Sequence, residues 1–437
     1  MATGVVENER TGDDAILASS GAGSYQTLPP CDSNIELFYA NKIPKAVVLT
    51  GDNSKYFSIK NSGHNAVESI PCDSLIFSDN LDALNALRVN YSGKVKLIYT
   101  DPPYGTGFDF QSRELDHAYT DKLGAASWVE MMRRRLILIR ELMSLDGSLY
   151  IHIGHQRLFH LKIIMDEVFG EDNFRNLIVR KKCSSKNSTK RQYPNLHDYI
   201  LFYTKSADYQ YDQPGVDPSD EWIKREYNKV DEYGRYKLVP IHAPGVRNGE
   251  TGMPWRGVEP PKGKHWRLAP SKLEERDKKG LIHWSKTGNP REKIYLTNDK
   301  KLPLTDYWGD FRDAHHQSKL ITGYPTEKNI DMLKVIVGAS SLPGDIVLDP
   351  FCGSGTLLQA AADLDRKFIG IDQSFTAVKH TLKRMRVGLE RMGDYVTSES
   401  TGNVVKNNIG IELIVDAVVL KENSDSLREL HELGYLS

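Results

Sequence analysis

The chain has 437 residues, a formal net charge of -1 and 39% hydrophobic residues, enough for one large α/β domain with a core and a sizeable insertion. Its four cysteines lie far apart without a C-x-x-C pair, which argues for a reducing compartment and against a cysteine-based zinc site. No apolar run is long enough to span a membrane, so we expect a cytoplasmic protein with no membrane partner. Its histidines lack metal-ligand spacing, so we expect no metal site. Because the net charge gives no overall attraction to nucleic acid, any such contact requires positive charge that is concentrated locally.

The character of the chain changes along its first half. Residues 1–32 are rich in Gly, Ser, Thr and acidic residues and lack periodicity, which predicts a mobile tail. Residues 33–77 are expected to form an N-terminal extension with strand-like runs at 46–49 and 74–77. From residue 78 to 205, apolar runs alternate with helical periodicity and predict one half of an α/β domain. The elements expected there are helices over 80–88, 126–143 and 156–169, and strands over 95–100, 148–153 and 199–203.

A second change follows this half. Residues 206–320 are rich in Pro, Gly, Trp and Tyr and show weak helical periodicity, which predicts an inserted domain. The α/β pattern then resumes over 321–390, and residues 391–437 are a C-terminal extension. The elements expected in the second half are helices over 329–340 and 356–363 and strands over 345–349 and 368–372. Together the two halves predict a doubly wound, mostly parallel sheet with helices on both faces.

The first strong motif, Asp101-Pro102-Pro103-Tyr104, ends the apolar strand over 95–100. In open α/β sheets, ligand chemistry lies just beyond the carboxyl ends of such strands. The Asp101 carboxylate and the Pro102 carbonyl can each accept a hydrogen bond from an amino group whose lone pair is delocalised into a ring. Tyr104 offers a face on which a base taken out of a duplex can stack. These four residues are the predicted catalytic set.

The second motif is Asp349-Pro350-Phe351-Cys352-Gly353-Ser354-Gly355-Thr356, which ends the strand over 345–349. Its glycines allow a ligand to approach the backbone closely at a strand-to-helix turn. Asp372 ends the next strand, where an acid commonly holds ribose hydroxyls, although a plain capping role is the alternative. The donor and acceptor of a transferred group must meet, so we expect the two turns to lie side by side in the fold.

These motifs, in this order, resemble the β-class amino-methyltransferases of DNA, in which DPPY precedes FxGxG. The closest resemblance is to adenine-specific enzymes related to the Mod subunits of Type III restriction–modification systems. It spans residues 78–385 and includes 243–247, 253–257 and 324–328. The resemblance implies a Rossmann-like sheet and methyl transfer from S-adenosylmethionine to adenine N6 of a flipped base in a short sequence of double-stranded DNA. It also implies a homodimer, a place on the nucleoid and, in some relatives, a restriction subunit as partner.

The resemblance extends to individual cofactor residues. Asp79 and Asn80 match a family position near the cofactor, although Asp79 could equally be an ordinary helix N-cap. Lys328 also matches, but the family's usual proline after this lysine is Asn329 here. The full expected cofactor-binding set is Asp79, Asn80, Lys328, Asp349, Pro350, Phe351, Gly353, Ser354, Gly355, Thr356 and Asp372.

Candidate DNA contacts come from the basic segment 175–191, which holds seven Lys or Arg residues and no acid, and from the insertion. Cations neutralise phosphates, and interleaved aromatic and basic side chains read base edges. The candidates are Lys181, Lys182, Lys186, Arg247, Trp255, Arg256, His265 and Trp266.

Alternatives to adenine methylation remain open at the level of sequence. Cytosine N4-methyltransferases use a similar turn but more often carry Ser at the position of Asp101, which favours adenine. An RNA amine-methylating enzyme is less favoured, because the insertion resembles the recognition region of the DNA enzymes. A non-catalytic DNA-binding specificity subunit would keep the fold, but the intact motif residues argue against it. The chain shows no nuclease or helicase pattern, so cleavage would have to come from a partner.

Overall fold

The computed structural model describes residues 36–50, 57–59, 70–105, 107, 109–111, 117–120, 122–183, 191–311, 320–321, 327–388, 390–391, 409–416 and 424–434. The expected tail over 1–32 and the candidate Lys186 lie outside these residues.

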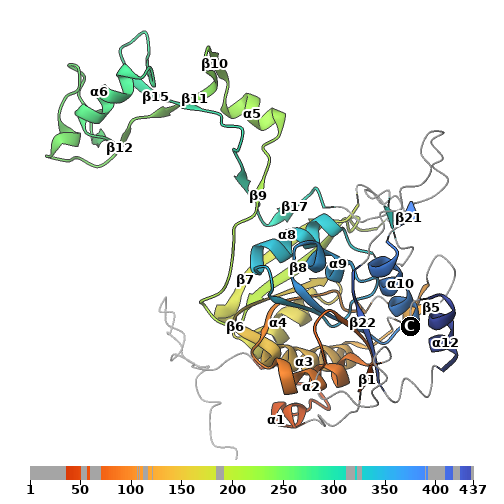
Figure 1. Ribbon diagram of the computed structural model, residues 1–437. Helices are drawn as coiled ribbons and strands as arrows, with labels where there is room; N and C mark the ends of the chain where they lie inside the picture. The colour runs from red at the N-terminus through yellow and green to blue at the C-terminus, as the bar shows by residue number, and fades with distance from the viewer. Residues whose placement is uncertain are drawn as a thin grey trace, which may run out of the picture.

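A single large sheet forms the centre of the body (Figure 1). Its strands, in spatial order, are β1 (Phe57–Ile59), β22 (Glu412–Asp416), β2 (Ser74–Phe77), β20 (Lys367–Asp372), β19 (Ile346–Asp349), β3 (Val95–Thr100), β6 (Met143–Ile153), β8 (His197–Thr204), β7 (Phe174–Lys181) and β17 (Tyr307–Trp308). The strands from β22 to β6 all run parallel, and β8 turns back antiparallel to both β6 and β7.

Helices cover both faces of this sheet because its strands are apolar on both sides. Ile76 points into the core beneath α2 (Asn80–Tyr91), α3 (Ala125–Leu142) and α4 (Leu158–Phe169). Its neighbours Leu75 and Phe77 point into the core beneath α8 (Ile330–Ser340), α9 (Thr356–Asp363) and α10 (Phe375–Arg386). Successive strand residues alternate between faces, so such runs require two helical layers. The predicted fold class, a doubly wound and mostly parallel α/β sheet, is confirmed.

The order of elements along the chain is rearranged in space. Strand β3 belongs to the first half of the domain and β19 to the second, yet they pair in parallel, with Leu348 beside Ile98. The turns that follow these two strands therefore leave the same edge of the sheet next to each other, as expected from the sequence. Asn329 starts α8 by accepting a hydrogen bond from the backbone N–H of Met332 at 3.1 Å.

One expected strand and the expected limits of the α/β domain differ from the structure. The run over 46–49 is not a strand but the short helix α1 (Lys45–Leu49), which follows Pro44 and buries only Val48. A strand inside a sheet would need burial on both faces, which this run does not have. In addition, the expected domain began at residue 78 and ended at 390, whereas β2 and β22 lie outside those limits and are integral strands of the sheet. The sequence pattern does not reveal that β2 pairs with β20, because the two strands lie far apart in the sequence.

The insertion leaves the body after β8 and returns at β17 (Figure 1). A two-stranded pair, β9 (Gly215–Val216) with β16 (Leu302–Pro303), forms the connection. Beyond it lie a sheet and a hairpin with two helices: β10 (Lys229–Asp231), β11 (Gly234–Pro240), β15 (Pro290–Tyr295), β14 (Ile282–Trp284), β12 (His242–Pro244), β13 (Lys264–Trp266), α5 (Asp220–Glu226) and α6 (Pro270–Lys278). This unit has its own small core, which is separate from the two cores of the body.

Smaller elements complete the described chain. They are β4 (Asp109–Gln111), β5 (His117–Thr120), the 3-10 turns Glu171–Asn173 and Glu250–Gly252, β18 (Leu320–Ile321), β21 (Glu390–Arg391) and α12 (Ser424–Glu432).

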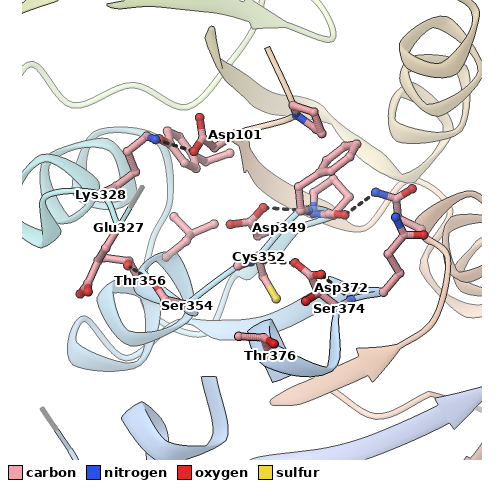
Figure 2. A pocket seen from close by; sticks show the side chains of 18 of the residues that line it. Asp101, Glu327, Lys328, Asp349, Cys352, Ser354, Thr356, Asp372, Ser374 and Thr376 are labelled. Carbon is pink, nitrogen blue, oxygen red and sulfur yellow. Dashed lines mark hydrogen bonds and ion pairs between the residues drawn. The ribbon is translucent and has the colours of Figure 1, made fainter. Parts of the chain in front are cut away.

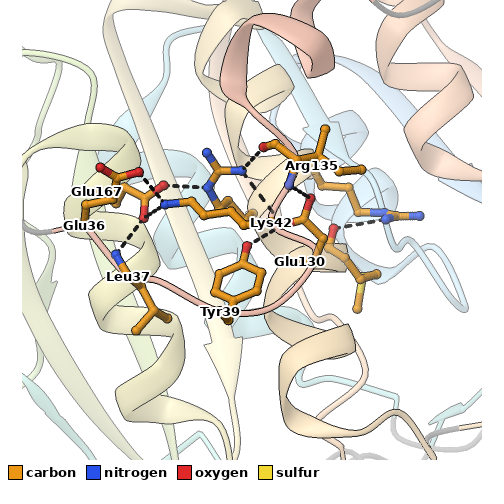
Figure 3. Close-up of polar contacts among 10 residues, drawn as sticks. Glu36, Leu37, Tyr39, Lys42, Glu130, Arg135 and Glu167 are labelled. Atoms are coloured by element: carbon orange, nitrogen blue, oxygen red, sulfur yellow. Dashed lines mark hydrogen bonds and ion pairs between the residues drawn. The ribbon is translucent and has the colours of Figure 1, made fainter. Parts of the chain in front are cut away.

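Residues 36–44, which we call the N-terminal strap, are held against α3 and α4 by a charged network (Figure 3). Glu167 of α4 accepts hydrogen bonds from Arg133 Nε at 2.5 Å, Lys42 Nζ at 3.0 Å and the backbone N–H of Leu37 at 3.1 Å. Burial alone would raise the pKa of Glu167, but these hydrogen bonds outweigh burial and leave the pKa below its ordinary value. The strap is therefore fixed by a carboxylate that must stay charged.

Replacing Glu167 with Gln is expected to lower the free energy of unfolding by about 2–3 kcal/mol at neutral pH, because Arg133 and Lys42 lose their anionic partner. The folded pKa lies below the unfolded one, so this stabilisation is complete above the ordinary value of 4.5 and is lost as the pH falls through the folded pKa. Urea titrations at several pH values measure the difference. The exposed Glu171→Gln is the control, with an expected effect below about 0.5 kcal/mol; equal effects of the two variants would contradict the assignment.

Candidate active site

A cavity of about 580 Å³ opens where the strands β3, β19 and β20 end (Figure 2). Both sequence motifs and Asp372 line it, together with the first residues of α9 and α10 and the side chains of Met131 and Arg135 from α3. Such a position, outside the carboxyl ends of parallel strands, is the usual ligand site of doubly wound sheets.

The turn Asp101–Tyr104, which the sequence predicts to be catalytic, places Asp101 at this cavity with both carboxylate oxygens engaged. Tyr104 Oη donates to Asp101 Oδ1 at 2.7 Å, and Lys328 Nζ lies 2.5 Å from Asp101 Oδ2. Burial and the nearby Asp101 raise the pKa of Tyr104, so its hydroxyl stays protonated and acts as the donor. Trp128 Nε1 donates to the Pro103 carbonyl at 2.6 Å and fixes the turn to α3.

A buried polar chain that the sequence analysis missed lies behind the catalytic turn. Tyr99, which lines the cavity, places its hydroxyl 2.9 Å from His152 Nδ1. His152 Nε2 lies 3.7 Å from Asp198, too far for a hydrogen bond, whereas Lys182 Nζ contacts Asp198 at 2.6 Å. Burial alone would raise the pKa of Asp198, but His152 and Lys182 hold it well below its ordinary value. From the sequence, the alternation along β6 and β8 predicts only that His152 and Asp198 lie on one face of the sheet. It does not predict that they lie close to each other.

The glycine turn is held by backbone hydrogen bonds to two carboxylates. Asp349 Oδ1 accepts from the N–H of Phe351 at 3.1 Å, and Asp372 accepts from the N–H groups of Gly353 and Ser374, each at 2.9 Å. Burial raises the pKa of Asp349, and it raises that of Asp372 to about 6 although these N–H groups oppose the shift. Asp372 therefore both shapes the turn and retains unused acceptor capacity toward the cavity.

Gly355 begins α9 in the left-handed conformation, with φ of +71°. A Cβ atom at this residue would lie only 2.7 Å from Thr381 Cγ2. The Thr381 hydroxyl in turn donates to the Gly353 carbonyl at 2.9 Å. Both the backbone angle and the close approach of α10 thus require glycine.

Asp79 and Asn80 connect β2 to the same cavity in different ways. Asp79 caps α2, accepting from the N–H of Leu81 at 2.8 Å, and pairs with Arg135 at 3.2 Å. Asn80 lines the cavity and donates to the Pro350 carbonyl at 2.7 Å, while Arg135 Nε donates to the Asn80 side chain. Of the expected pair, Asn80 faces the cavity and Asp79 mainly shapes the turn.

Glu327 and Lys328 bridge the two motif turns. Buried Glu327 forms an ion pair with Arg384, whose Nε donates to the Ser354 carbonyl at 2.8 Å. Lys328, next in the chain, reaches the other turn through Asp101. Arg384 and Arg135 were missed because a cation on an amphipathic helix is read as solvent-exposed until its buried partner is known.

Several candidate DNA contacts are buried or paired within the insertion. Trp255 and Trp266 are 4% and 1% exposed in the core of the insertion, and buried His265 contacts the Gly245 carbonyl at 2.8 Å. Arg256 is paired with Glu274 and Asp277. These three buried side chains offer little surface to a ligand, because the core of a small unit needs the same aromatic residues that can read bases.

The remaining DNA candidates differ in availability. Lys182 is engaged by Asp198, Lys181 is half-buried in β7, and Arg247 is exposed. Within the part of the chain that the structure describes, no group of His, Cys, Asp and Glu is arranged to hold a metal ion. None of the described helices could cross a membrane.

The family model and the sequence relatives place the chain in one family. Residues 95–383 match the family model described as DNA methylase. The chain is 54% identical over 371 residues to Type II methyltransferase M.EcaI of Enterobacter cloacae, covering 85% of this chain and 82% of that protein. It is 27% identical to the Type III restriction-modification enzyme StyLTI Mod subunit of Salmonella typhimurium, over 66% of this chain but only 49% of that protein. The solved M1.HpyAVI–SAM complex gives a TM-score of 0.37 at 17% identity, covering 71% of this chain and 98% of that one.

Substituting Gly355 by Ala is expected to lower the free energy of unfolding by about 2 kcal/mol through backbone strain and the contact with Thr381. The matched control is Gly338→Ala in α8, where a Cβ meets no atom within 4 Å and stability should instead rise by about 0.5–1 kcal/mol. Thermal unfolding of both variants is the measurement. Equal shifts for the two variants would show that the turn tolerates a side chain.

Proposed function

We propose, from the premise that this chain belongs to the DNA methylase family, that it transfers a methyl group from S-adenosylmethionine to adenine N6 in a short DNA sequence. The observation that carries the proposal is the meeting of the Asp101–Tyr104 turn and the glycine turn in one cavity. Adenine is favoured over cytosine because the first residue of the catalytic turn is Asp101, where cytosine enzymes more often carry Ser.

The lining of the cavity suits the chemistry of the expected cofactor. S-adenosylmethionine supplies an electrophilic methyl group on a sulfonium cation, and the carboxylates of Asp101, Asp349 and Asp372 line the cavity. Asp372 ends β20 with acceptor capacity for ribose hydroxyls, and Gly353 of the glycine turn lines the cavity beside it. Asn80, Ser354 and Thr356 complete the polar lining that would hold the group.

The catalytic turn is suited to an amine that is a poor nucleophile. Asp101 and the carbonyl of Pro102 accept hydrogen bonds from the two amino hydrogens, which draws the nitrogen toward tetrahedral geometry and frees its lone pair. The nitrogen–methyl bond would form as the methyl–sulfur bond breaks, with S-adenosylhomocysteine as the leaving group. The Asp101 carboxylate would stabilise the positive charge on the nitrogen until one amine proton passes to water. Tyr104 provides the stacking face once its hydroxyl releases Asp101.

The insertion is the proposed site of sequence recognition. Three exposed cations lie around His242. Lys264 belongs to β13, Arg267 directly follows that strand, and Arg291 belongs to β15. Burial, and then the charges of these three residues, lower the pKa of His242. The three cations thus concentrate positive charge on one region of the insertion. We name this group the His242 patch. Phosphates of the DNA backbone are its expected partners.

Assembly and location follow from the same proposal. Double-stranded DNA is the substrate, and cytoplasmic activity on the nucleoid follows from that substrate. A homodimer and a separate restriction subunit are the proposed protein partners; the name of the Mod subunit relative supports the second. Mass measurement of the purified protein with and without DNA tests the dimer.

Replacing Asp101 with Ala or Asn is expected to reduce methyl transfer about a thousandfold or more, because the amine loses the acceptor that also stabilises its positive charge. Binding of S-adenosylhomocysteine should remain, since the glycine turn and Asp372 are untouched. Long-read modification sequencing of DNA from cells that express the wild type or the variant is the assay. Normal N6-methyladenine in the variant would refute the mechanism, and N4-methylcytosine in the wild type would refute the choice of base.

Replacing Lys264, Arg267 and Arg291 together by Gln should weaken DNA binding and reduce the slope of log affinity against log salt by about 2–3, since each phosphate contact contributes roughly 0.9. Arg256→Gln is the control, because Glu274 and Asp277 already neutralise its charge. Fluorescence anisotropy at several salt concentrations measures both. An unchanged slope in the triple variant would remove the His242 patch from the DNA interface.

A further inference from the structure

Two segments that carry the family resemblance, 243–247 and 253–257, do not line the cavity. They belong to the hairpin of β12 and β13 and to the loop between these strands. We call this hairpin, residues 242–266, the finger. Figure 1 shows β12 at the outer end of the insertion, away from the body. The role of the finger must therefore lie in what it presents to solvent.

The base of the finger is anchored in the core of the insertion. Trp266 is 1% exposed, and its Nε1 donates to the Met253 carbonyl at 2.9 Å. His265 Nδ1 lies 2.8 Å from the Gly245 carbonyl, and the Gly245 N–H donates to the Gly263 carbonyl at 2.9 Å. The backbone on either side of the tip is thus held in place by buried or hydrogen-bonded groups.

The tip of the finger is closed by a contact that depends on glycine. A Cβ atom on Gly252 would lie 1.8 Å from the carbonyl oxygen of Arg247, so a side chain here would push the two stretches of the loop apart. Val246 and Met253 each lie one residue outside this contact, and they are 75% and 59% exposed. Two apolar side chains are therefore held in solvent on adjoining stretches of backbone.

The finger also carries positive charge that the insertion does not neutralise. Within residues 206–311, all of which the structure describes, Arg247, Lys262 and Lys264 are exposed and form no ion pair. Arg256, by contrast, is paired with acids of α6. The whole finger has four Lys or Arg and two Glu, so its net charge is positive. An apolar tip beside cations fits a polyanion with an apolar interior, which is the construction of a DNA duplex.

We propose that the finger enters the DNA duplex, with Met253 inserted between two stacked bases and with Arg247 and Lys264 on flanking phosphates. This inference rests on the proposed function, because a DNA substrate is its premise. An apolar side chain inserted at a base step unstacks that step and kinks the duplex. The finger thus favours sequences in which one step opens easily, as pyrimidine–purine steps do.

The test looks for an opened step away from the target base. Duplexes that contain the methylated sequence, with 2-aminopurine at each non-target position in turn, are titrated with protein and S-adenosylhomocysteine. Because 2-aminopurine fluoresces more strongly when it is unstacked, the wild type should raise the fluorescence at one such step. Met253→Ala should lose this signal and bind the duplex about tenfold more weakly, as expected for the loss of a buried apolar side chain. Met253→Leu should keep both.

A pair of glycine variants tests the shape of the tip without removing a side chain. Gly252→Ala should lose the opened step, because its Cβ atom displaces the Arg247 carbonyl. Gly249→Ala is the matched control in the same loop, since a Cβ atom there meets nothing within 4 Å. Val230→Ala, at a 63% exposed position of β10, controls for the loss of any exposed apolar side chain. Thermal unfolding confirms that each variant is folded.

The outcomes separate the finger from the proposed function. An opened step that persists in Met253→Ala overturns the proposal, and so does an equal loss in Gly249→Ala or Val230→Ala. A lower oligomeric mass of Met253→Ala with unchanged DNA binding would make the tip a protein contact and would also overturn it. A wild-type protein that methylates its sequence without opening a non-target step removes the finger and leaves the proposed function standing. If the wild type methylates no DNA, the proposed function has failed and the inference fails with it.

Discussion

The parallel pairing of β3 with β19 is the constraint on which the site depends. These strands come from halves of the chain separated by the whole insertion, yet their register brings the ends that carry Asp101 and Asp349 together. The surrounding contacts maintain this arrangement: Asn80 holds the carbonyl of Pro350, and Arg384 holds that of Ser354. A shift of one residue between the strands would reverse which side chains face each core and would separate the two turns.

The parts of the fold that were predictable are those that local chemistry dictates. Apolar strands that end in polar turns located Asp101, the glycine turn and Asp372, because such strands are buried and such turns lie at a sheet edge. The prediction of a strand over 46–49 was wrong, because four apolar residues fit a helical turn as well as a strand. The sheet positions of β2 and β22 depend on pairing between distant segments, which periodicity does not reveal.

Side-chain roles were harder to predict than elements. Arg135, Arg384 and Lys182 looked like surface cations, but each has a carboxylate partner from elsewhere in the chain. Conversely, Trp255 and Trp266 looked like contact residues and are the core of the insertion. In both cases the missing information was burial, which depends on partners distant in sequence and is not a property of a residue's own neighbours.

The two-stranded link formed by β9 and β16 separates the insertion, with its own core, from the body, where the two motif turns lie (Figure 1). A substitution that remodels the surface of the insertion therefore changes neither the packing around Asp101 nor that around Gly355. Because mutational effects at distant, uncoupled positions add, the proposed recognition by the insertion and the proposed catalysis in the body can accumulate changes separately. Under that proposal, a chain built in this way can acquire a new target sequence during evolution while its catalyst stays the same.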